Sequence, residues 1–426
     1  MRIINVLFFA TFITLPAFAQ TLDAEIARRT AAVNEKTVTW RRDFHRNPEL
    51  SKQEVRTAKV VADHLRALGM EVKEGVGGTG VTGLLRGAKA EPVVALRADM
   101  DALPVVEETG LTFASTKKTT YQGQEVGVMH ACGHDAHTAM LMGVAEVLAG
   151  MKDQLQGSVK FIFQPAEEGE GGAVAMIADG ALENPKPSAI FGLHVMSSEH
   201  TGKVNYRAGG LMAASDRFEI LVKGKQTHGA YPWRGVDPIV AASQIVLGLQ
   251  TIASRQLDPT LAPAIVTVGS FQGGVRYNII PEEVRLVGTT RALDPDMRKD
   301  IHERLKRTAE HIAQSAGATA TVTIDPNGTG VTWNDIPLTE RMAPTLARIA
   351  GDGNAVVINP TVVAEDFSAF QERIPGMFFF LGATPPSTSL TDAAPNHSPR
   401  FFVDEAAMPL GVKALAALAV DYLAMQ

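Results

Sequence analysis

The segment Val159-Lys-Phe-Ile-Phe-Gln-Pro-Ala-Glu-Glu168 joins a short apolar run to two adjacent glutamates. Residues 93–96 and 189–193 are two further short apolar runs, and residues 138–148, which precede the quoted segment, have the pattern of a helix. Short apolar runs that alternate with helical stretches are typical of an α/β domain. The sequence therefore predicts that the three runs are strands of one largely parallel sheet flanked by helices.

Each predicted strand is followed by side chains that can carry chemistry. Asp99 and Asp101 follow the first strand, Glu167 and Glu168 the second, and His194 the third. In an open α/β sheet, ligands bind beyond the carboxyl ends of the strands. We therefore expect these acids and this histidine to meet at one edge of the sheet.

The pattern changes near Gly209 and changes back near residue 326. Between these points the strands alternate apolar and polar residues, as in an antiparallel sheet with one solvated face. The predicted elements there are strands at 217–222, 264–268 and 284–289 and helices at 239–249 and 297–316. The predicted fold is an α/β domain of residues 20–209 and 326–426 with a smaller α+β domain, residues 210–325, inserted into it.

A glycine-rich segment, Gly75-Val-Gly-Gly-Thr-Gly80, formally matches the dinucleotide fingerprint. That fingerprint needs a helix to begin at the glycines, so that its N-terminus can bind pyrophosphate. Residues 81–87 are short and strand-like instead. We therefore predict a turn between two strands.

The N-terminus resembles a secretion signal. Met1-Arg2 is followed by an apolar run at residues 3–15 and by Pro16-Ala-Phe-Ala19. This pattern predicts a signal at residues 1–19 and a secreted, periplasmic protein. We expect no membrane anchor, because the apolar run is short and no later segment offers the roughly 20 uninterrupted apolar residues of a membrane helix.

Composition limits the class of protein. The 426 residues, 45% hydrophobic and 20% charged, are enough for a large core and two domains. The formal net charge of −6 argues against nucleic acid and against anionic membrane surfaces as partners.

The chain's single cysteine, Cys132, stands two residues before His134. Thiolate and imidazole both suit borderline divalent metals, and the intervening glycine lets both side chains converge. In an oxidising compartment a lone cysteine without such a role must be buried or paired with another chain. The alternative interpretation is a buried cysteine beside a surface histidine; His130 and His137 are weaker ligand candidates.

The adjacent acids Glu167 and Glu168 repel each other unless something cationic holds them. If one binds a metal and the other stays free to carry a proton, the pair supplies both parts of metal-assisted hydrolysis. The alternative is a solvated acidic turn. Asp101 is expected to support a metal ligand, whereas Asp99 could do the same or form a surface ion pair. Residues 364–367 either cap the next helix or form another wall of the site.

Together, five motifs resemble the M20 metallopeptidase family. More narrowly they resemble its amidohydrolase branch, which includes hippurate hydrolases, auxin-conjugate hydrolases and N-acetyldiaminopimelate deacetylases. The motifs are Arg97-Ala-Asp-Met-Asp-Ala-Leu-Pro104, His130-Ala-Cys-Gly-His-Asp-Ala-His137, Gln164-Pro-Ala-Glu-Glu-Gly169, Gly192-Leu-His194 and Ala364-Glu-Asp-Phe367. The resemblance implies a catalytic domain and an inserted lid, which in the family is usually the interface of a homodimer or higher homo-oligomer.

The resemblance also implies roles for individual residues. Two divalent ions, Mn²⁺ or Zn²⁺ in the first place and Co²⁺ or Ni²⁺ as alternatives, would be held by five ligands: Cys132, His134, Glu168, His194 and His397. Glu167 would be the general base, and Asp101 would assist the reaction from beside the metals.

In the lid, His228 resembles a histidine that reaches across the dimer to polarise the scissile carbonyl. Asn278 resembles a substrate-binding asparagine, and Arg276 is a candidate for a substrate carboxylate, because a guanidinium binds it through two hydrogen bonds. Without the resemblance, His228 and Arg276 would be ordinary surface residues. The chain departs from the family at Pro232-Trp-Arg234, where many members have a second histidine.

The predicted activity is metal-dependent hydrolysis of N-acyl amino acids to a carboxylate and a free amino acid. One alternative is a dipeptidase or carboxypeptidase of the same family. Arg97 argues against it, because peptidase branches tend to have a metal-binding histidine in this motif. The other alternative is a non-catalytic periplasmic protein that binds a metal or an amino-acid conjugate, and the free Glu167 argues against that.

Overall fold

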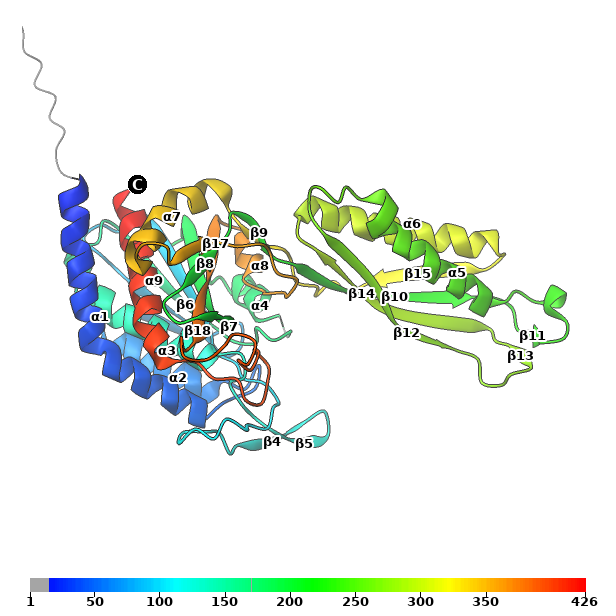
Figure 1. Ribbon diagram of the computed structural model, residues 1–426, viewed down its shortest axis with the longest axis horizontal. Coiled ribbons are helices and arrows are strands. Elements are labelled where there is room, and N and C mark those ends of the chain that lie inside the picture. Colours follow the sequence, from blue (N-terminus) through cyan, green and yellow to red (C-terminus); the bar gives the residue numbers. More distant parts are fainter. Residues whose placement is uncertain (1–14, 170) are drawn as a thin grey trace, which may run out of the picture.

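Four parallel strands form the centre of the sheet in the larger of two lobes (Figure 1). In this computed structural model, which describes residues 15–169 and 171–426, the order across the sheet is β6 (Ser158–Gln164), β3 (Val93–Asp99), β7 (Ala189–His200) and β18 (Gly376–Thr384). Three of them are buried along their whole length, which explains their almost uninterrupted apolar sequence. The three runs predicted from the sequence are thus neighbouring strands of one sheet.

Shorter strands complete the sheet on both sides. β2 (Gly80–Leu85) pairs antiparallel with β6 and with β1 (Glu71–Val76), and β8 (Val204–Tyr206) joins β18 to β17 (Ala355–Val357). The glycine-rich segment links β1 to β2, so a strand follows these glycines. The predicted turn is confirmed, and the dinucleotide fingerprint is accidental.

Helices cover both faces of this sheet (Figure 1). One face packs against α1 (Leu15–Arg46), α2 (Val55–Ala67), α3 (His134–Ala149) and α9 (Met408–Ala424), with α7 (Ile336–Ala350) against α9. The other face packs against α4 (Gly172–Ala178) and α8 (Ser368–Gln371). Neighbouring residues of β3 pack on opposite faces of the sheet. Leu96 lies in the core on the α3 and α9 side, and Ala95 lies in the core on the α4 and α8 side.

The smaller lobe is a four-stranded antiparallel sheet with a core of its own. Its order is β12 (Ala264–Gly273), β14 (Glu283–Ala292), β10 (Ala214–Lys223) and β15 (Thr319–Ile324), and α5 (Pro238–Thr251) and α6 (Pro295–Ser315) cover one face. Buried and more exposed residues alternate along β10 and β14, because the other face is not covered by helices. The predicted fold class is confirmed: a largely parallel α/β domain plus a smaller α+β domain.

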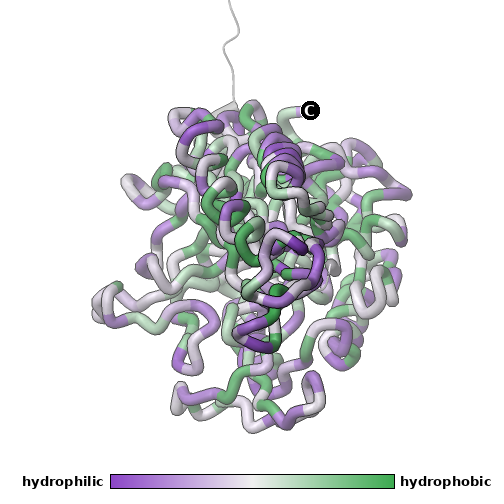
Figure 2. The backbone as a smooth tube through the Cα atoms, turned by 90° about the vertical axis from the view of Figure 1, so that its right-hand side faces the viewer, coloured by the Kyte–Doolittle hydropathy of each residue, from purple (hydrophilic) through white to green (hydrophobic). Residues whose placement is uncertain are grey.

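Short elements complete the fold. β4 (Lys118–Tyr121) and β5 (Gln124–Gly127) form a hairpin, β9 (Gly209–Met212) pairs with β16 (Thr332–Asn334), and β11 (Thr227–His228) pairs with β13 (Ile279–Ile280). The β11–β13 pair lies at the end of the smaller lobe farthest from the larger one (Figure 1). Single helical turns span Lys152–Gln154, Pro232–Arg234, Ile252–Gln256 and Glu405–Ala407. Viewed from the smaller lobe, strongly hydrophilic segments follow the outer loops (Figure 2).

Within the described residues, one helical segment, Glu405–Ala424, is long and apolar enough to cross a membrane. Its mean hydropathy is 1.4, although Lys413 and Asp421 interrupt it, and 78% of this window is buried in the molecule. The segment packs as a core helix of the larger lobe. The predicted secretion signal, residues 1–19, falls mostly outside the described residues.

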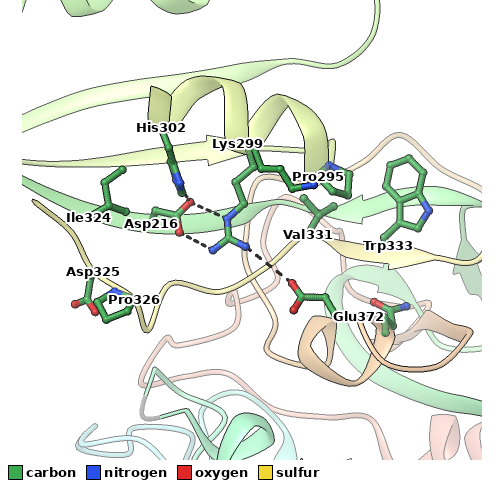
Figure 3. Close-up of a pocket in the computed structure, with 12 residues that line it drawn as sticks. Asp216, Pro295, Lys299, His302, Ile324, Asp325, Pro326, Val331, Trp333 and Glu372 are labelled. Atoms are coloured by element: carbon green, nitrogen blue, oxygen red, sulfur yellow. Dashed lines mark hydrogen bonds and ion pairs between the residues drawn. The ribbon is translucent and has the colours of Figure 1, made fainter. Parts of the chain in front are cut away.

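Two chain segments connect the lobes, and an ionic cluster lies beside them. Ser215 and Thr329 exchange backbone hydrogen bonds of 3.0 Å, which ties the two connections together. Arg298 of α6 donates to both carboxylate oxygens of buried Asp216, at 2.7 and 3.0 Å, and to the Gly328 carbonyl at 3.3 Å. Its remaining nitrogen lies 4.0 Å from Glu372 of the larger lobe, across a cavity of about 460 Å³ (Figure 3).

Replacement of Arg298 by Ala should destabilise the smaller lobe by about 2 to 3 kcal/mol, because it removes the ion pair of the buried Asp216 carboxylate, which then keeps the 2.9 Å contact with His302 Nε2. Urea unfolding followed by circular dichroism measures the change. Lys299→Ala is the matched control on the same helix, since Lys299 is exposed and pairs only with Asp296; it should change stability by less than about 0.5 kcal/mol. Equal unfolding midpoints for the two variants would contradict a stabilising role for the Arg298–Asp216 pair.

Candidate metal centre

The carboxyl ends of β6, β3 and β7 converge, as the sequence predicts. β3 ends at Asp99, which pairs with Gln164 at the end of β6, and β7 runs parallel to β3 on the other side. Glu167 and Glu168 follow β6 directly, and His194 lies within β7. Because parallel strands end at the same edge of a sheet, these side chains reach one site.

Cys132 lies at the centre of this site. Its Sγ is 3.3 Å from Nε2 of His194 and 3.3 Å from Nε2 of His397, and its side chain is buried. Gly133, with a φ of 99°, turns the chain into α3, which begins at His134. A Cβ on this glycine would lie 2.3 Å from the Val195 side chain, so the residue between cysteine and histidine has to be small.

The two glutamates approach the same imidazoles. Glu168 Oε1 lies 3.3 Å from His397 Nε2 and 4.0 Å from His134 Nε2, and Glu167 Oε2 lies 3.9 Å from His134 Nε2. Among the groups of ligand atoms within 4.8 Å of one another, three overlap here: Cys132 with His134 and His194, Cys132 with Glu168 and His397, and His134 with Glu167 and Glu168. The structure thus brings together all five residues for which the sequence predicts metal binding.

The chemistry of these side chains fits divalent metal ions. His134 Nε2 and Glu168 Oε1 are buried and have no hydrogen-bond partner among the described residues. Burial and the carboxylates of Glu168 and Glu167 raise the pKa of the Cys132 thiol well above its usual value, a penalty that a nearby cation would reverse. Thiolate, imidazole and carboxylate are the ligands of Zn²⁺ and of related divalent ions.

Asp101 orients His134 and the turn that carries the glutamates. Its Oδ1 lies 3.2 Å from His134 Nδ1, so the other ring nitrogen faces the site. It also accepts backbone N–H bonds of 3.1 Å each from Glu167 and Glu168, and a bond from Ser51. Burial lowers the pKa of His134, but the carboxylates of Asp99 and Asp101 outweigh burial and raise it to about 10.

The two weaker histidine candidates have other surroundings. His137 Nδ1 lies 2.6 Å from Asp99, and its Nε2 accepts the Val195 N–H at 2.8 Å, so both ring nitrogens are engaged. His130 is buried, and neither of its ring nitrogens has a hydrogen-bond partner in the part of the chain that the structure describes. Burial lowers its pKa to about 4. Asp99 is buried and supports His137, which excludes a surface ion pair for it.

Behind the glutamates, Arg97 is buried among carboxylates. Its guanidinium lies 2.6 Å from Asp99, 2.9 Å from Glu365 and 3.2 Å from Asp366. The segment 364–367, which the sequence left as a cap or a wall, therefore forms a wall of the site. Burial and the carboxylates of Glu365 and Glu168 raise the pKa of Glu167 well above its usual value.

Asn396, which the sequence reasoning missed, fixes the loop that carries His397. Its amide donates to the carbonyls of Cys132 and Val195, at 3.2 and 3.1 Å, and its Oδ1 accepts from the Ser197 N–H. His397 itself has a left-handed φ of 70°. In the sequence, the available signal for Asn396 was its position next to the predicted ligand His397 in a polar loop.

A cavity of about 400 Å³ opens over these residues. Its other walls come from both lobes: Met196, Met212, Ser215, Arg291, Thr329, Val363, Glu365 and Asn396. Arg291 of β14 brings a guanidinium into it, and nothing in the sequence around Arg291 indicated this position.

Three predicted residues lie elsewhere in the chain. His228 belongs to β11, and Arg276 and Asn278 belong to the segment between β12 and β13, at the far end of the smaller lobe (Figure 1). His228 and Arg276 are exposed, and Trp233 is 74% exposed. A single chain, as the structure describes it, does not bring these residues to the metal centre.

Residues 95–421 match the family model for peptidase family M20/M25/M40. The chain belongs to this family. It is 41% identical over 393 residues to thermostable carboxypeptidase 2 of Saccharolobus solfataricus, with 92% of this chain and 96% of that protein covered. It is also 41% identical over 386 residues to IAA-amino acid hydrolase ILR1-like 5 of Arabidopsis thaliana, with 90% and 86% covered.

Among solved structures, the YXEP protein of Bacillus subtilis, a dinuclear metal-binding peptidase from the M20 family, is 36% identical with a TM-score of 0.79, and 93% of this chain and 100% of that chain are covered. Family, relatives and the buried ligand groups together identify this M20 protein as a metal-dependent amidohydrolase.

Replacement of Cys132 by Ala in this M20 enzyme should weaken metal binding by roughly tenfold or more, because it removes a ligand shared by two groups, one with His134 and His194 and one with Glu168 and His397. Metal per chain after dialysis, measured by inductively coupled plasma mass spectrometry, tests this. His311→Ala, an exposed histidine of α6, is the control and should bind metal like the wild type. Unchanged metal content in the Cys132 variant would remove Cys132 from the ligand set.

Proposed function

We propose that this enzyme hydrolyses the amide bond of N-acyl amino acids and releases a carboxylate and a free amino acid. The observation that supports this most directly is Glu167, a carboxylate that lines the cavity 3.9 Å from His134, beside the predicted metal ligands. The carboxylate beside it, Glu168, is the one that contacts both His134 and His397. A protein that only binds its ligand needs no such free carboxylate.

Cys132, His134, Glu168, His194 and His397 would hold two divalent ions, Mn²⁺ or Zn²⁺ first, with Co²⁺ and Ni²⁺ as alternatives. When bound, such ions polarise a carbonyl and lower the pKa of water. Asp101 contributes by holding His134 and the backbone of both glutamates. His194 has a pKa well below its usual value because of burial, so the ring is neutral and ready to act as a ligand.

Glu167 would act as the proton carrier. It takes a proton from the attacking water and gives it to the nitrogen of the leaving amino acid. Its surroundings suit this role, because burial and neighbouring carboxylates make its carboxylate a stronger base than an exposed glutamate.

The cavity wall suggests how the substrate is held. Arg291 is the guanidinium that the described part of the chain brings into this cavity, so we place the substrate carboxylate there rather than at Arg276. Met196, Met212 and Val363 offer apolar surface for the acyl group or the side chain. Carboxypeptidase activity is the second candidate, because the Saccharolobus relative is named a carboxypeptidase. A peptide substrate also has a carboxylate beside its scissile amide.

His228 and Asn278 would reach the metal centre of a second copy in a homodimer. Their position at the free end of the smaller lobe supports this, because they are too far from the site of their own chain. We also propose that the protein is secreted to the periplasm, on the basis of residues 1–19 alone.

Replacement of Glu167 by Gln should lower turnover by about 100- to 10,000-fold while the metal content stays near that of the wild type, because the amide cannot accept a proton. The measurement is release of free amino acid from a panel of N-acyl amino acids and dipeptides, with metal analysis of the same samples. Full activity in this variant would end the mechanism. Faster release from dipeptides by the wild type would favour the second candidate.

The two inactive variants Glu167→Gln and His228→Ala should restore each other when their subunits are mixed. In a mixed dimer one site keeps both Glu167 and a partner's His228, so random exchange should return about a quarter of wild-type activity. The test is activity after unfolding and refolding of an equimolar mixture, with each variant alone as control. Failure to recover activity would place His228 outside the catalytic machinery of the second copy.

A further inference from the structure

Glu365 is a buried carboxylate with one oxygen left without a partner. The residue is 1% exposed, and its Oε1 accepts hydrogen bonds of 2.9 Å from both Arg97 and the Phe367 N–H. Its Oε2 is buried and has no donor within the described protein, yet Glu365 lines the same cavity as Glu167 and the metal ligands. A buried polar atom without a hydrogen-bond partner lowers the stability of the protein. A bound molecule that donates a hydrogen bond to this oxygen removes that cost, which favours binding.

The charges around Glu365 select the kind of donor. Oxygens of Glu167, Glu365 and Asp366 lie within 4.8 Å of one another, and one guanidinium, Arg97, serves Glu365, Asp366 and also Asp99. The described side chains around this point thus carry more negative than positive charge. Such surroundings favour an N–H group that becomes positively charged over an anion or an apolar group.

The spacing fits a single nitrogen between two carboxylates. A nitrogen with ordinary hydrogen bonds of about 2.9 Å to two oxygens, at close to a tetrahedral angle, bridges oxygens about 4.8 Å apart. Glu167 is the group that gives its proton to the leaving nitrogen in the proposed function. Because an oxygen of Glu167 and an oxygen of Glu365 lie no farther apart than this, one nitrogen can donate to both carboxyl groups.

We propose that Glu365 is the acceptor for the scissile N–H and for the ammonium of the released amino acid. In this step, which rests on the proposed function, the C–N bond breaks and a C–O bond forms to the oxygen of water. The proton that Glu167 took from water goes to the nitrogen, and the free amine then takes one more proton from solvent. The carboxyl group of Glu365, held by Arg97 at 2.9 Å, accepts a hydrogen bond from the nitrogen and favours the charge that develops on it. It thereby makes the site selective for amides with an N–H.

Asp366 provides a matched control. It also pairs with Arg97, but its oxygens accept hydrogen bonds from Gln164 at 2.6 Å and from the Ala173 N–H at 3.0 Å, and it does not line the cavity. Glu365→Gln keeps an oxygen for Arg97 and Phe367 but turns an N–H donor toward the cavity. Asp366→Asn removes the same charge from the Arg97 network without touching the bound molecule.

The first test is calorimetric binding to the metal-loaded enzyme. The probes are glycine, L-methionine and L-phenylalanine, each paired with the acid that lacks the amino group: acetate, 4-(methylthio)butanoate and 3-phenylpropanoate. Glu365→Gln should weaken binding of the best amino acid by about 10- to 100-fold and leave its deamino partner unchanged. Asp366→Asn should shift both by the same factor. Equal losses for both probes in Glu365→Gln, or no amino-acid binding to the wild type, would overturn the proposal.

The second test separates this proposal from the proposed function. Hydrolysis of N-acyl amino acids by the wild type decides the proposed function. The ratio of kcat/KM for an N-acyl amino acid to that for the acyl ester of the matching 2-hydroxy acid, whose leaving oxygen carries no hydrogen, decides the role of Glu365. This ratio should fall about 10-fold or more in Glu365→Gln and stay constant in Asp366→Asn. Glu365→Asp, which keeps the charge but shortens the side chain, should lie between them; an unchanged ratio in both Glu365 variants would contradict the proposal.

Discussion

The ion pairs of Arg97 make the rest of the site possible. Its guanidinium is fully buried and bonds to Asp99, Glu365 and Asp366, which come from segments more than 260 residues apart. Without it, the interior would hold several uncompensated carboxylates, and charge burial of that kind is strongly destabilising. The wall behind the glutamates, the support of His137 through Asp99 and the position of residues 364–367 all depend on this one cation. The predicted metal ions would balance the carboxylates on the opposite side of the site.

The two lobes contribute different parts of the site. The larger lobe supplies every predicted metal ligand and the proposed proton carrier, from the ends of its strands, the start of α3 and, for His397, the loop after β18. The smaller lobe supplies Arg291 from β14 and the junction residues Ser215 and Thr329 to the same cavity. The contacts of a molecule that touches both walls therefore depend on the angle between the lobes. Residues of both lobes thus line one cavity, although each lobe has a hydrophobic core of its own.

The sequence predicted what depends on local pattern. The buried strands, the amphipathic helices and the turn at the glycines follow from periodicity that a short window contains. The convergence of Glu167, Glu168 and His194 followed from one rule about parallel sheets. Arg291 and Asn396 could not be found in this way, because their roles depend on distant segments that only the folded chain brings together. The surroundings of Asp99 were equally hidden, since its partner His137 lies 38 residues away along the chain. His228 and Asn278 were chosen by resemblance and Arg276 for the chemistry of its guanidinium, and the position of all three at the far end of the smaller lobe shows why no local pattern could place them.

The paired connection between the lobes has an evolutionary consequence. The chain leaves and re-enters the larger lobe at Ser215 and Thr329, which bond to each other. The segment between these two residues is therefore joined to the larger lobe through two adjacent connections. Such a segment can be lengthened, remodelled or exchanged without disturbing the order of the strands that hold the acids and histidines. Changes in this segment can therefore alter Arg291 and the other smaller-lobe residues of the cavity while the predicted metal ligands and Glu167 stay in place.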